Sequence, residues 1–109
     1  MATPTDIRIL RKSRLLELSY EGGETLQLPF EYLRVFSPSA EVRGHGEGQE
    51  VLQVGKQDVL ISGIMPVGHY AIKIIFDDGH DSGLYGWDYL QELAANQEQN
   101  WLEYLAQLD

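Results

Sequence analysis

The chain has 109 residues, a formal net charge of −9 and no cysteine. This length, with 43% hydrophobic and 23% charged residues, predicts a single compact domain over residues 1–109. The negative charge disfavours nucleic acid and anionic membranes as partners, and the lack of cysteine excludes disulfides, thiolate nucleophiles, thiolate zinc sites and cysteine-held iron–sulfur clusters.

The first third of the chain predicts a three-stranded antiparallel meander and one short helix. Its opening, MATPTDIRILRKSR, has no apolar run typical of a signal peptide, and no later stretch reaches membrane-spanning length, so we expect a cytoplasmic location. Three short apolar runs indicate the strands: IRILRK at 7–12, LLELSY at 15–20 and ETLQLP at 24–29. FEYLRVF at 30–36 then predicts a short helix closed by Ser37 and Pro38.

The middle of the chain predicts a loop followed by more strands. RGHGEGQE at 43–50 combines three glycines with polar residues and should form a loop that carries His45. The further strands are QDVLISGIMPVG at 57–68, HYAIKIIFDDG at 69–79 and GLYGW at 83–87. Asp78 and Gly79 are a favourable pair for the hairpin turn before the last of these strands.

From Trp87 onward the apolar residues recur three or four apart, which predicts a C-terminal helical segment. The stretch from Asn96 to Asn100 leaves open whether 87–108 is one helix or two. We therefore predict an α+β fold: a mostly antiparallel β-sheet with a short helix after the third strand and a C-terminal helical segment, of which 96–109 is an extension. The predicted core comprises Leu16, Leu18, Leu33, Ile61, Ile64, Ile72, Ile74, Phe76, Tyr85, Leu90 and Leu93.

The acidic charge is concentrated in the C-terminal third. No Lys or Arg occurs from Ile74 onward, and the acidic residues of this stretch are Asp77, Asp78, Asp81, Asp88, Glu92, Glu98, Glu103 and Asp109. A basic partner surface would match this charge, and a plain solvated surface is the alternative. Trp101, Leu105 and Leu108 could cover a partner or a second subunit, so a homodimer stays open.

Four motifs occur in order along the chain. They are PTDIRILRKSRLLEL at 4–18, LRVFSPSAEVR at 33–43, VGHYAIKIIFDDGH at 67–80 and SGLYGWDYL at 82–90. The most specific part is the arrangement DGH-x-x-G-x-Y-x-W-x-x-L from Asp78 to Leu90. Together these motifs resemble the gamma-butyrobetaine hydroxylase-like N-terminal domain family over about residues 4–95. The family occurs as small stand-alone bacterial proteins and as a module of larger ones.

The resemblance implies the fold of this family without its zinc site. In zinc-binding members a Cys-Pro-Cys-Ala-x-Cys knuckle and the histidine of the Asp-Gly-His turn hold the metal. Here the three cysteine positions are Ser37, Ser39 and Val42, and only His80 matches a ligand. Serine hydroxyls are poor zinc ligands and valine is none, so no cofactor is expected. We expect His80 to be a structural turn residue that hydrogen-bonds near Ser37 or Ser39.

Two alternatives for His80 stay open. A weak carboxylate–histidine site could use His80 with Asp77 or Asp81 and with His45, because oxygen and imidazole donors can hold a divalent ion. The second alternative is an unassigned polar contact or a proton-transfer role.

No complete catalytic motif is visible. The namesake hydroxylases use a separate iron and 2-oxoglutarate domain that does not fit in 109 residues. The His-x-Asp…His iron triad, the Gly-x-Ser-x-Gly elbow and the Walker phosphate loop are also missing. The resemblance implies a domain attached elsewhere to hydroxylases and to iron–sulfur carrier ATPases.

We therefore predict a non-catalytic interaction or adaptor module with a protein partner. Its candidate surface comprises Trp87, Tyr89, Glu98, Trp101 and Glu103. The alternative is a small metal-handling or catalytic protein centred on His80 and its neighbouring carboxylates.

Overall fold

The computed structural model describes residues 3–44 and 50–108 and has the predicted α+β fold. Its elements, in chain order, are β1 (Asp6–Leu10), β2 (Leu15–Ser19), β3 (Thr25–Pro29), α1 (Phe30–Val35), α2 (Ala40–Arg43), β4 (Ile61–Val67), β5 (Ala71–Phe76), β6 (Leu84–Gly86), α3 (Trp87–Ala95) and α4 (Gln97–Gln107). None of these helices is both long and apolar enough to cross a membrane.

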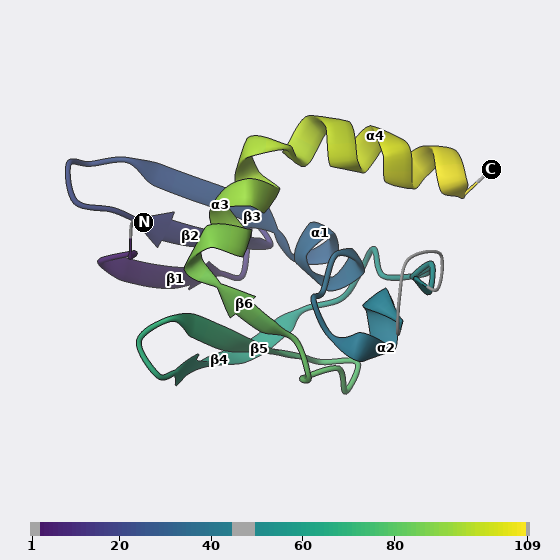
Figure 1. Ribbon diagram of the computed structural model, residues 1–109, viewed down its shortest axis with the longest axis horizontal. Coiled ribbons are helices and arrows are strands. Elements are labelled where there is room, and N and C mark those ends of the chain that lie inside the picture. Colours follow the sequence, from purple (N-terminus) through teal and green to yellow (C-terminus); the bar gives the residue numbers. More distant parts are fainter. Residues whose placement is uncertain (1–2, 45–49, 109) are drawn as a thin grey trace.

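The strands divide into two three-stranded antiparallel sheets (Figure 1). The first sheet has the order β1-β2-β3, and Leu16 in its central strand lies opposite Ile9 and Leu28. The second sheet has the order β4-β5-β6, and Ile72 in its central strand lies opposite Pro66 and Tyr85. The chain leaves the first sheet at β3 and passes through α1 and α2 before it starts the second.

The predicted tight hairpin at Asp78-Gly79 is a longer connection, because residues 80–83 do not continue the pairing with β5. A turn covers residues 77–79, and Gly79 has φ of 90°, a backbone conformation that favours glycine. The Phe76 N–H donates to the carbonyl of His80 at 3.0 Å, and strand pairing resumes only in β6. The predicted turn and return strand are therefore present, joined by a longer connection.

One hydrophobic cluster joins both sheets to α1 and α3. All the predicted core residues except Ile64 are buried in it. Ile64 is half-buried because β4 lies at the edge of its sheet. The cluster also contains Leu28, Phe30 and Tyr32, which the prediction omitted.

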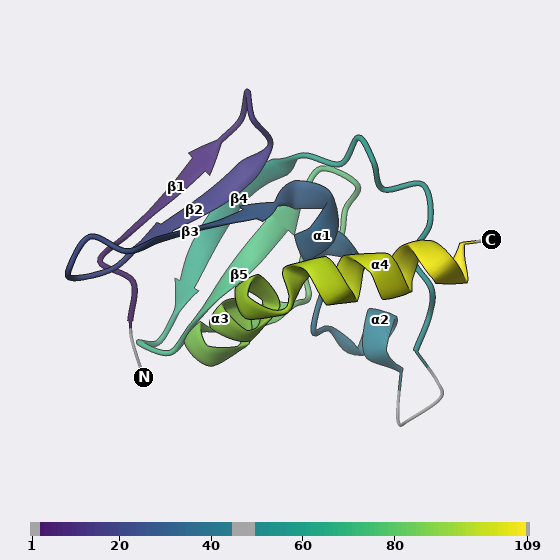
Figure 2. The ribbon, with the colours of Figure 1, turned by 90° about the horizontal axis from the view of Figure 1, so that it is seen from above.

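The C-terminal segment is two helices, which decides the question that the sequence left open. Asn96 separates α3 from α4, and its Nδ2 donates to the carbonyl of Glu92 at 3.0 Å. α4 runs past α1 toward the C-terminal end of the chain (Figures 1 and 2). The sequence does not predict α2, because a single helical turn is too short to give a periodic pattern.

Candidate functional site

A charged cluster holds the turn that follows β5. The Arg34 Nε donates to Asp78 Oδ2 at 2.9 Å, and the Lys56 ammonium donates to the same oxygen at 3.0 Å. Asp78 Oδ1 accepts the backbone N–H of His80 at 3.1 Å, while Arg34 also donates to Gln53 Oε1 at 3.0 Å. The Arg34 side chain is buried, so α1 and this turn are joined by an ion pair that water screens weakly.

The pKa of Asp78 is about 2, well below its ordinary value. Burial raises this pKa, but hydrogen bonds from Lys56, from the His80 backbone and from Arg34 outweigh the burial because they stabilise the ionised carboxylate. The cluster is therefore charged at neutral pH.

Acid is expected to weaken this cluster. Because the folded-state pKa of Asp78 is depressed from 3.8 to about 2, its stabilising contribution is present above pH 3.8 and is lost as the pH falls through about 2. The shift corresponds to about 2 kcal/mol. We expect the difference in unfolding free energy between wild type and Asp78→Asn, measured in urea at pH 6 and about pH 2, to shrink by roughly this amount. An equal difference at both pH values would contradict the ion pair.

His80 points inward from the turn to two serines. Its Nε2 lies 2.8 Å from Ser37 Oγ and 3.4 Å from Ser39 Oγ, and its Nδ1 lies 3.4 Å from Glu41 Oε2. Since the carboxylate can only accept, Nδ1 carries the proton and Nε2 accepts from the Ser37 hydroxyl. Burial lowers the pKa of His80, as does the positive charge of Arg34, while Glu41 partly opposes both. The expected hydrogen bond to Ser37 is thus present, with a neutral imidazole.

Ser37, His80 and Glu41 have the connectivity of a serine–histidine–acid triad, but the surroundings do not suit a nucleophile. Ser37 is only 1% exposed, and the backbone N–H of Ser39 donates to its Oγ at 3.3 Å. Glu41 is largely exposed and accepts a second hydrogen bond from Ser82. A nucleophile must reach a substrate carbonyl, so this geometry favours a structural cluster.

Gly83 lies tightly against the same cluster. A Cβ added to Gly83 would overlap Ser37 Oγ, and it would lie 3.2 Å from Pro38 Cδ and 3.3 Å from the Tyr85 ring. Tyr85 is itself held by the hydrogen bond from its hydroxyl to the carbonyl of Leu33 at 2.6 Å. The chain therefore needs the absence of a side chain at Gly83 to bring His80 and Ser37 together.

Replacing Gly83 by alanine is expected to destabilise the protein by about 1–3 kcal/mol, because the new methyl group overpacks a site that has no room to relax. Gly63→Ala is the matched control, since a Cβ there meets nothing within 4 Å. Thermal melting compares the two variants. If Gly83→Ala melted at the same temperature as Gly63→Ala, the close packing around Ser37 would be wrong.

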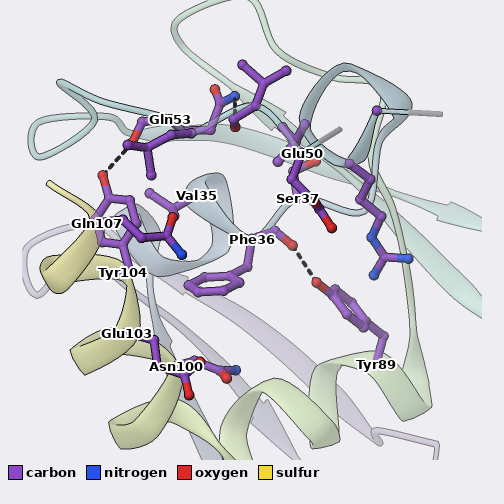
Figure 3. Close-up of a pocket in the computed structure, with 15 residues that line it drawn as sticks. Val35, Phe36, Ser37, Glu50, Gln53, Tyr89, Asn100, Glu103, Tyr104 and Gln107 are labelled. Carbon is purple, nitrogen blue, oxygen red and sulfur yellow. Dashed lines mark hydrogen bonds between the residues drawn. The ribbon is translucent and has the colours of Figure 1, made fainter. Parts of the chain in front are cut away.

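A pocket of about 740 Å³ lies beside this cluster, between α1, α2, the segment after residue 50, α3 and α4 (Figure 3). The rings of Phe36, Tyr89 and Tyr104 line it. The Tyr89 hydroxyl donates to the carbonyl of Phe36 at 2.6 Å, and the Tyr104 hydroxyl donates to the carbonyl of Gln53 at 2.5 Å (Figure 3). Arg43 covers the Tyr89 ring at 4.8 Å. These hydroxyls are engaged in holding the pocket wall.

Comparison with known proteins places the chain in a family. The gamma-butyrobetaine hydroxylase-like, N-terminal family matches residues 7–91. The chain belongs to this family. No curated protein matches it.

Solved structures agree with this membership. Two proteins with NMR solution structures are 53% and 51% identical to the chain, with TM-scores of 0.84 and 0.85. Both cover 99% of this chain, which spans 85% and 80% of theirs. A crystal structure of a protein of unknown function from Acidithiobacillus ferrooxidans, described as a member of the DUF971 family, is 39% identical with a TM-score of 0.71. It covers 85% of this chain, which spans 93% of it.

In this member of the gamma-butyrobetaine hydroxylase-like N-terminal family, the residues at the zinc-ligand positions lie together but do not fit zinc. Ser37 and Ser39 face His80, and Val42 is buried one turn later in α2. Two neutral hydroxyls and a branched alkyl group replace the thiolates, and the Nε2 that would bind the metal accepts from Ser37 instead. Within the described ranges, no three His, Asp or Glu side chains are grouped so as to hold a metal ion.

The alternative weak metal site is not assembled from its described members. Asp77 Oδ1 accepts the backbone N–H of Leu60 at 3.0 Å, and Asp81 pairs with Lys73 at 3.7 Å. Since His80 faces Ser37, the three side chains contact three different neighbours. His45 lies outside the described residues.

The aromatic residues predicted to bind a partner are half-buried packing residues. The Trp87 indole donates to the carbonyl of His69 at 2.8 Å, and Tyr89 forms part of the pocket wall. Trp101 packs edge-on against Tyr32 and lies 4.9 Å, centroid to centroid, from Tyr104. They attach α3 and α4 to the domain rather than forming an open aromatic patch.

The other two predicted residues, Glu98 and Glu103, are exposed on α4. Sequence reasoning missed Arg34 as part of the site, although the Leu33-Arg34 pair stands in the family motif. It also missed Leu102, whose three-residue spacing to Leu105 was the available signal.

Proposed function

We propose that the chain is a non-catalytic protein-binding module whose partner docks on exposed leucines of the C-terminal segment. The observation that carries this proposal is a row of exposed leucines. Leu102 is 61% exposed, Leu105 42% and Leu108 41%, and their spacing of three places them along one side of the helical segment. We call these three residues the leucine row. Apolar side chains grouped in this way are typical of interaction surfaces.

The position of α4 relative to the region matched by the family supports this proposal. The family match ends at residue 91, before α4 begins at Gln97. Leu93 is the last residue in the sequence among the buried members of the core cluster. Tyr104 is the buried residue of the helix. α4 is attached to the core through Trp101 and Tyr104 and presents an additional surface, and both NMR structures match the chain through this region.

The polar cluster supports a non-catalytic role. Ser37, His80 and Asp78 are each engaged in hydrogen bonds within the protein, and these bonds link α1 and the following segment to the turn after β5. A buried network whose members are all satisfied stabilises one fold without leaving a group ready for chemistry.

Ser37 is expected to stay unlabelled by a fluorophosphonate probe, because such probes need an accessible, activated serine and its side chain is buried. Intact-mass spectrometry after incubation measures the adduct, with a known serine hydrolase as the positive control. An adduct that forms on wild type and is absent from Ser37→Ala would instead favour a catalytic role.

Affinity capture from the lysate of the native host tests the docking proposal. Tagged wild type is compared with Leu102→Ser, Leu105→Ser, and captured proteins are then purified and titrated directly by calorimetry. Met65→Ser, Leu84→Ser is the matched control, because it removes two exposed apolar residues from the second sheet. We expect a partner that binds wild type and control alike and binds the leucine variant at least about tenfold more weakly. Equal capture by all three proteins would refute docking on the leucine row.

A further inference from the structure

We infer that the partner of α4 presents a basic amphipathic segment, with apolar side chains for the leucine row and Lys or Arg around them. This inference rests on the proposed docking function and adds the chemistry of the partner. It follows from the charge on both C-terminal helices and from the engagement of the protein's own basic residues.

The two C-terminal helices present only negative charge. Asp88 and Glu92 on α3 and Glu98 and Glu103 on α4 are all exposed. The last basic residue before them is Lys73, which pairs with Asp81 on the second sheet. No lysine or arginine of this chain therefore neutralises the helices from within their own sequence, and their field attracts cations.

The two acidic residues of α4 differ in their position relative to the leucine row. Glu98 precedes Leu102 by four residues, so it continues the row toward the start of α4. Glu103 lies on the other side of the helix, where it lines the pocket between α2 and α4 (Figure 3). A segment that covers the leucines brings its flanking side chains close to Glu98. Positive charge there is favourable, whereas negative charge is repelled.

A second copy of this chain is a poorer occupant. Two α4 helices packed through their leucine rows would bring Glu98 of one copy toward acidic residues of the other. Three arginines of β1 and of the turn after it also have partners within the chain: Arg8 pairs with Glu17 at 3.9 Å, Arg14 pairs with Asp58 at 3.3 Å, and Arg11 donates to the carbonyl of Ile61 at 2.7 Å. An anionic membrane surface is repelled by the net charge of −9.

The test compares two synthetic peptides that differ only in the sign of their charge. Each is a fluorescein-labelled helix of about 16 residues with leucines on one face, and the remaining positions carry Lys in one peptide and Glu in the other. Fluorescence anisotropy at about 0.15 M salt measures their binding to the full chain. We expect the Lys peptide to bind at least about tenfold more tightly than the Glu peptide.

Two variants separate the contributions of the leucines and the charges. We expect Leu102→Ser, Leu105→Ser and, separately, Glu98→Gln, Glu103→Gln to weaken the Lys peptide about tenfold. Glu21→Gln, Glu24→Gln removes the same charge from the exposed β2–β3 turn and should leave binding unchanged. The inference would be overturned if the leucine variant bound the Lys peptide as tightly as wild type does, or if wild type bound both peptides equally. It would also be overturned if sedimentation showed that the wild type is a dimer and that the leucine variant is not.

The two proposals can fail separately. A host protein that is lost with the leucine variant but binds Glu98→Gln, Glu103→Gln as well as wild type would uphold docking and refute the basic partner. If every captured host protein binds the leucine variant as well as it binds wild type, docking itself is refuted, whichever peptide binds.

Discussion

Cysteines at positions 37, 39 and 42 are expected to turn this protein into a tight zinc binder. In the variant Ser37→Cys, Ser39→Cys, Val42→Cys, three thiolates and His80 would supply the four ligands of a tetrahedral site. The wild-type geometry already approaches this arrangement, because Ser37 Oγ and Ser39 Oγ lie 2.8 Å and 3.4 Å from His80 Nε2. A sulfur and a nitrogen bound to the same zinc are about 3.5 Å apart, so small shifts suffice. Val42 adds the third position from the buried side of α2.

The surroundings of His80 also favour this variant. Glu41 lies at 3.4 Å from Nδ1, so the imidazole presents Nε2 toward the knuckle in the way that carboxylates orient metal-binding histidines. Because its pKa is lowered, the His80 imidazole needs to release little of its own proton at neutral pH, so the protons released come from the thiols.

Calorimetry under reducing conditions and thermal melting with equimolar zinc measure the effect. At zinc concentrations about a thousandfold above the dissociation constant, the variant should gain about 4 kcal/mol in unfolding free energy, while wild type gains nothing. Adding His80→Ala to the triple variant should weaken binding, which serves as the control. A triple variant that takes up zinc no more tightly than wild type would show that these positions do not match the family's ligands.

Arg34→Met is expected to cost about 3 kcal/mol of unfolding free energy. The substitution keeps much of the apolar volume but leaves the carboxylate of Asp78 without its buried partner, and removing one member of a buried pair is costly. Lys56 still contacts Asp78, which keeps the loss at the lower end of the usual range. The substitution also leaves Gln53 Oε1 without the hydrogen bond that it accepts from the Arg34 guanidinium at 3.0 Å.

Urea unfolding at pH 7 measures this loss. Arg8→Met is the matched control: Arg8 is largely exposed, its distance to Glu17 is 3.9 Å, and a pair of this kind contributes less than about 1 kcal/mol. The double variant Arg34→Met, Asp78→Asn should lose less unfolding free energy than the sum of the losses in the two single variants, because each substitution removes the same interaction. If Arg34→Met and Arg8→Met unfolded at the same urea concentration, Arg34 would not anchor the turn.

Local sequence patterns were sufficient to predict most of the secondary structure and nearly all of the chosen core. The β2 and β5 strands follow from alternation, α1 from its short run after Pro29, and the burial of Leu16, Ile74 and Tyr85 from their places in these patterns. These features depend on neighbours a few residues apart. The same local view missed α2, where contacts with the rest of the chain decide the path.

The family motif took the prediction of the site further than periodicity could. The motif predicted that Ser37 and Ser39 lie near His80, although they are 43 and 41 residues away from it in the sequence. The structure places both serine hydroxyls close to the His80 imidazole. The motif gave no warning that Arg34 is buried, because a charged residue on a short amphipathic helix is usually solvated. Asp77, His80 and Asp81 contact three different neighbours, because adjacency in sequence does not determine side-chain direction within a turn.

The sequence by itself determined the α+β class, the family and the loss of the thiolate ligands, because these depend on residue identity and local spacing. Only the tertiary structure decided that the strands form two sheets, that Arg34 pairs with Asp78 over 44 residues, and that the aromatic residues of α3 and α4 are half-buried or buried while the leucine row is exposed. The physical reason is that each of these features depends on which distant surfaces meet, and burial and charge pairing are settled only when the whole chain packs.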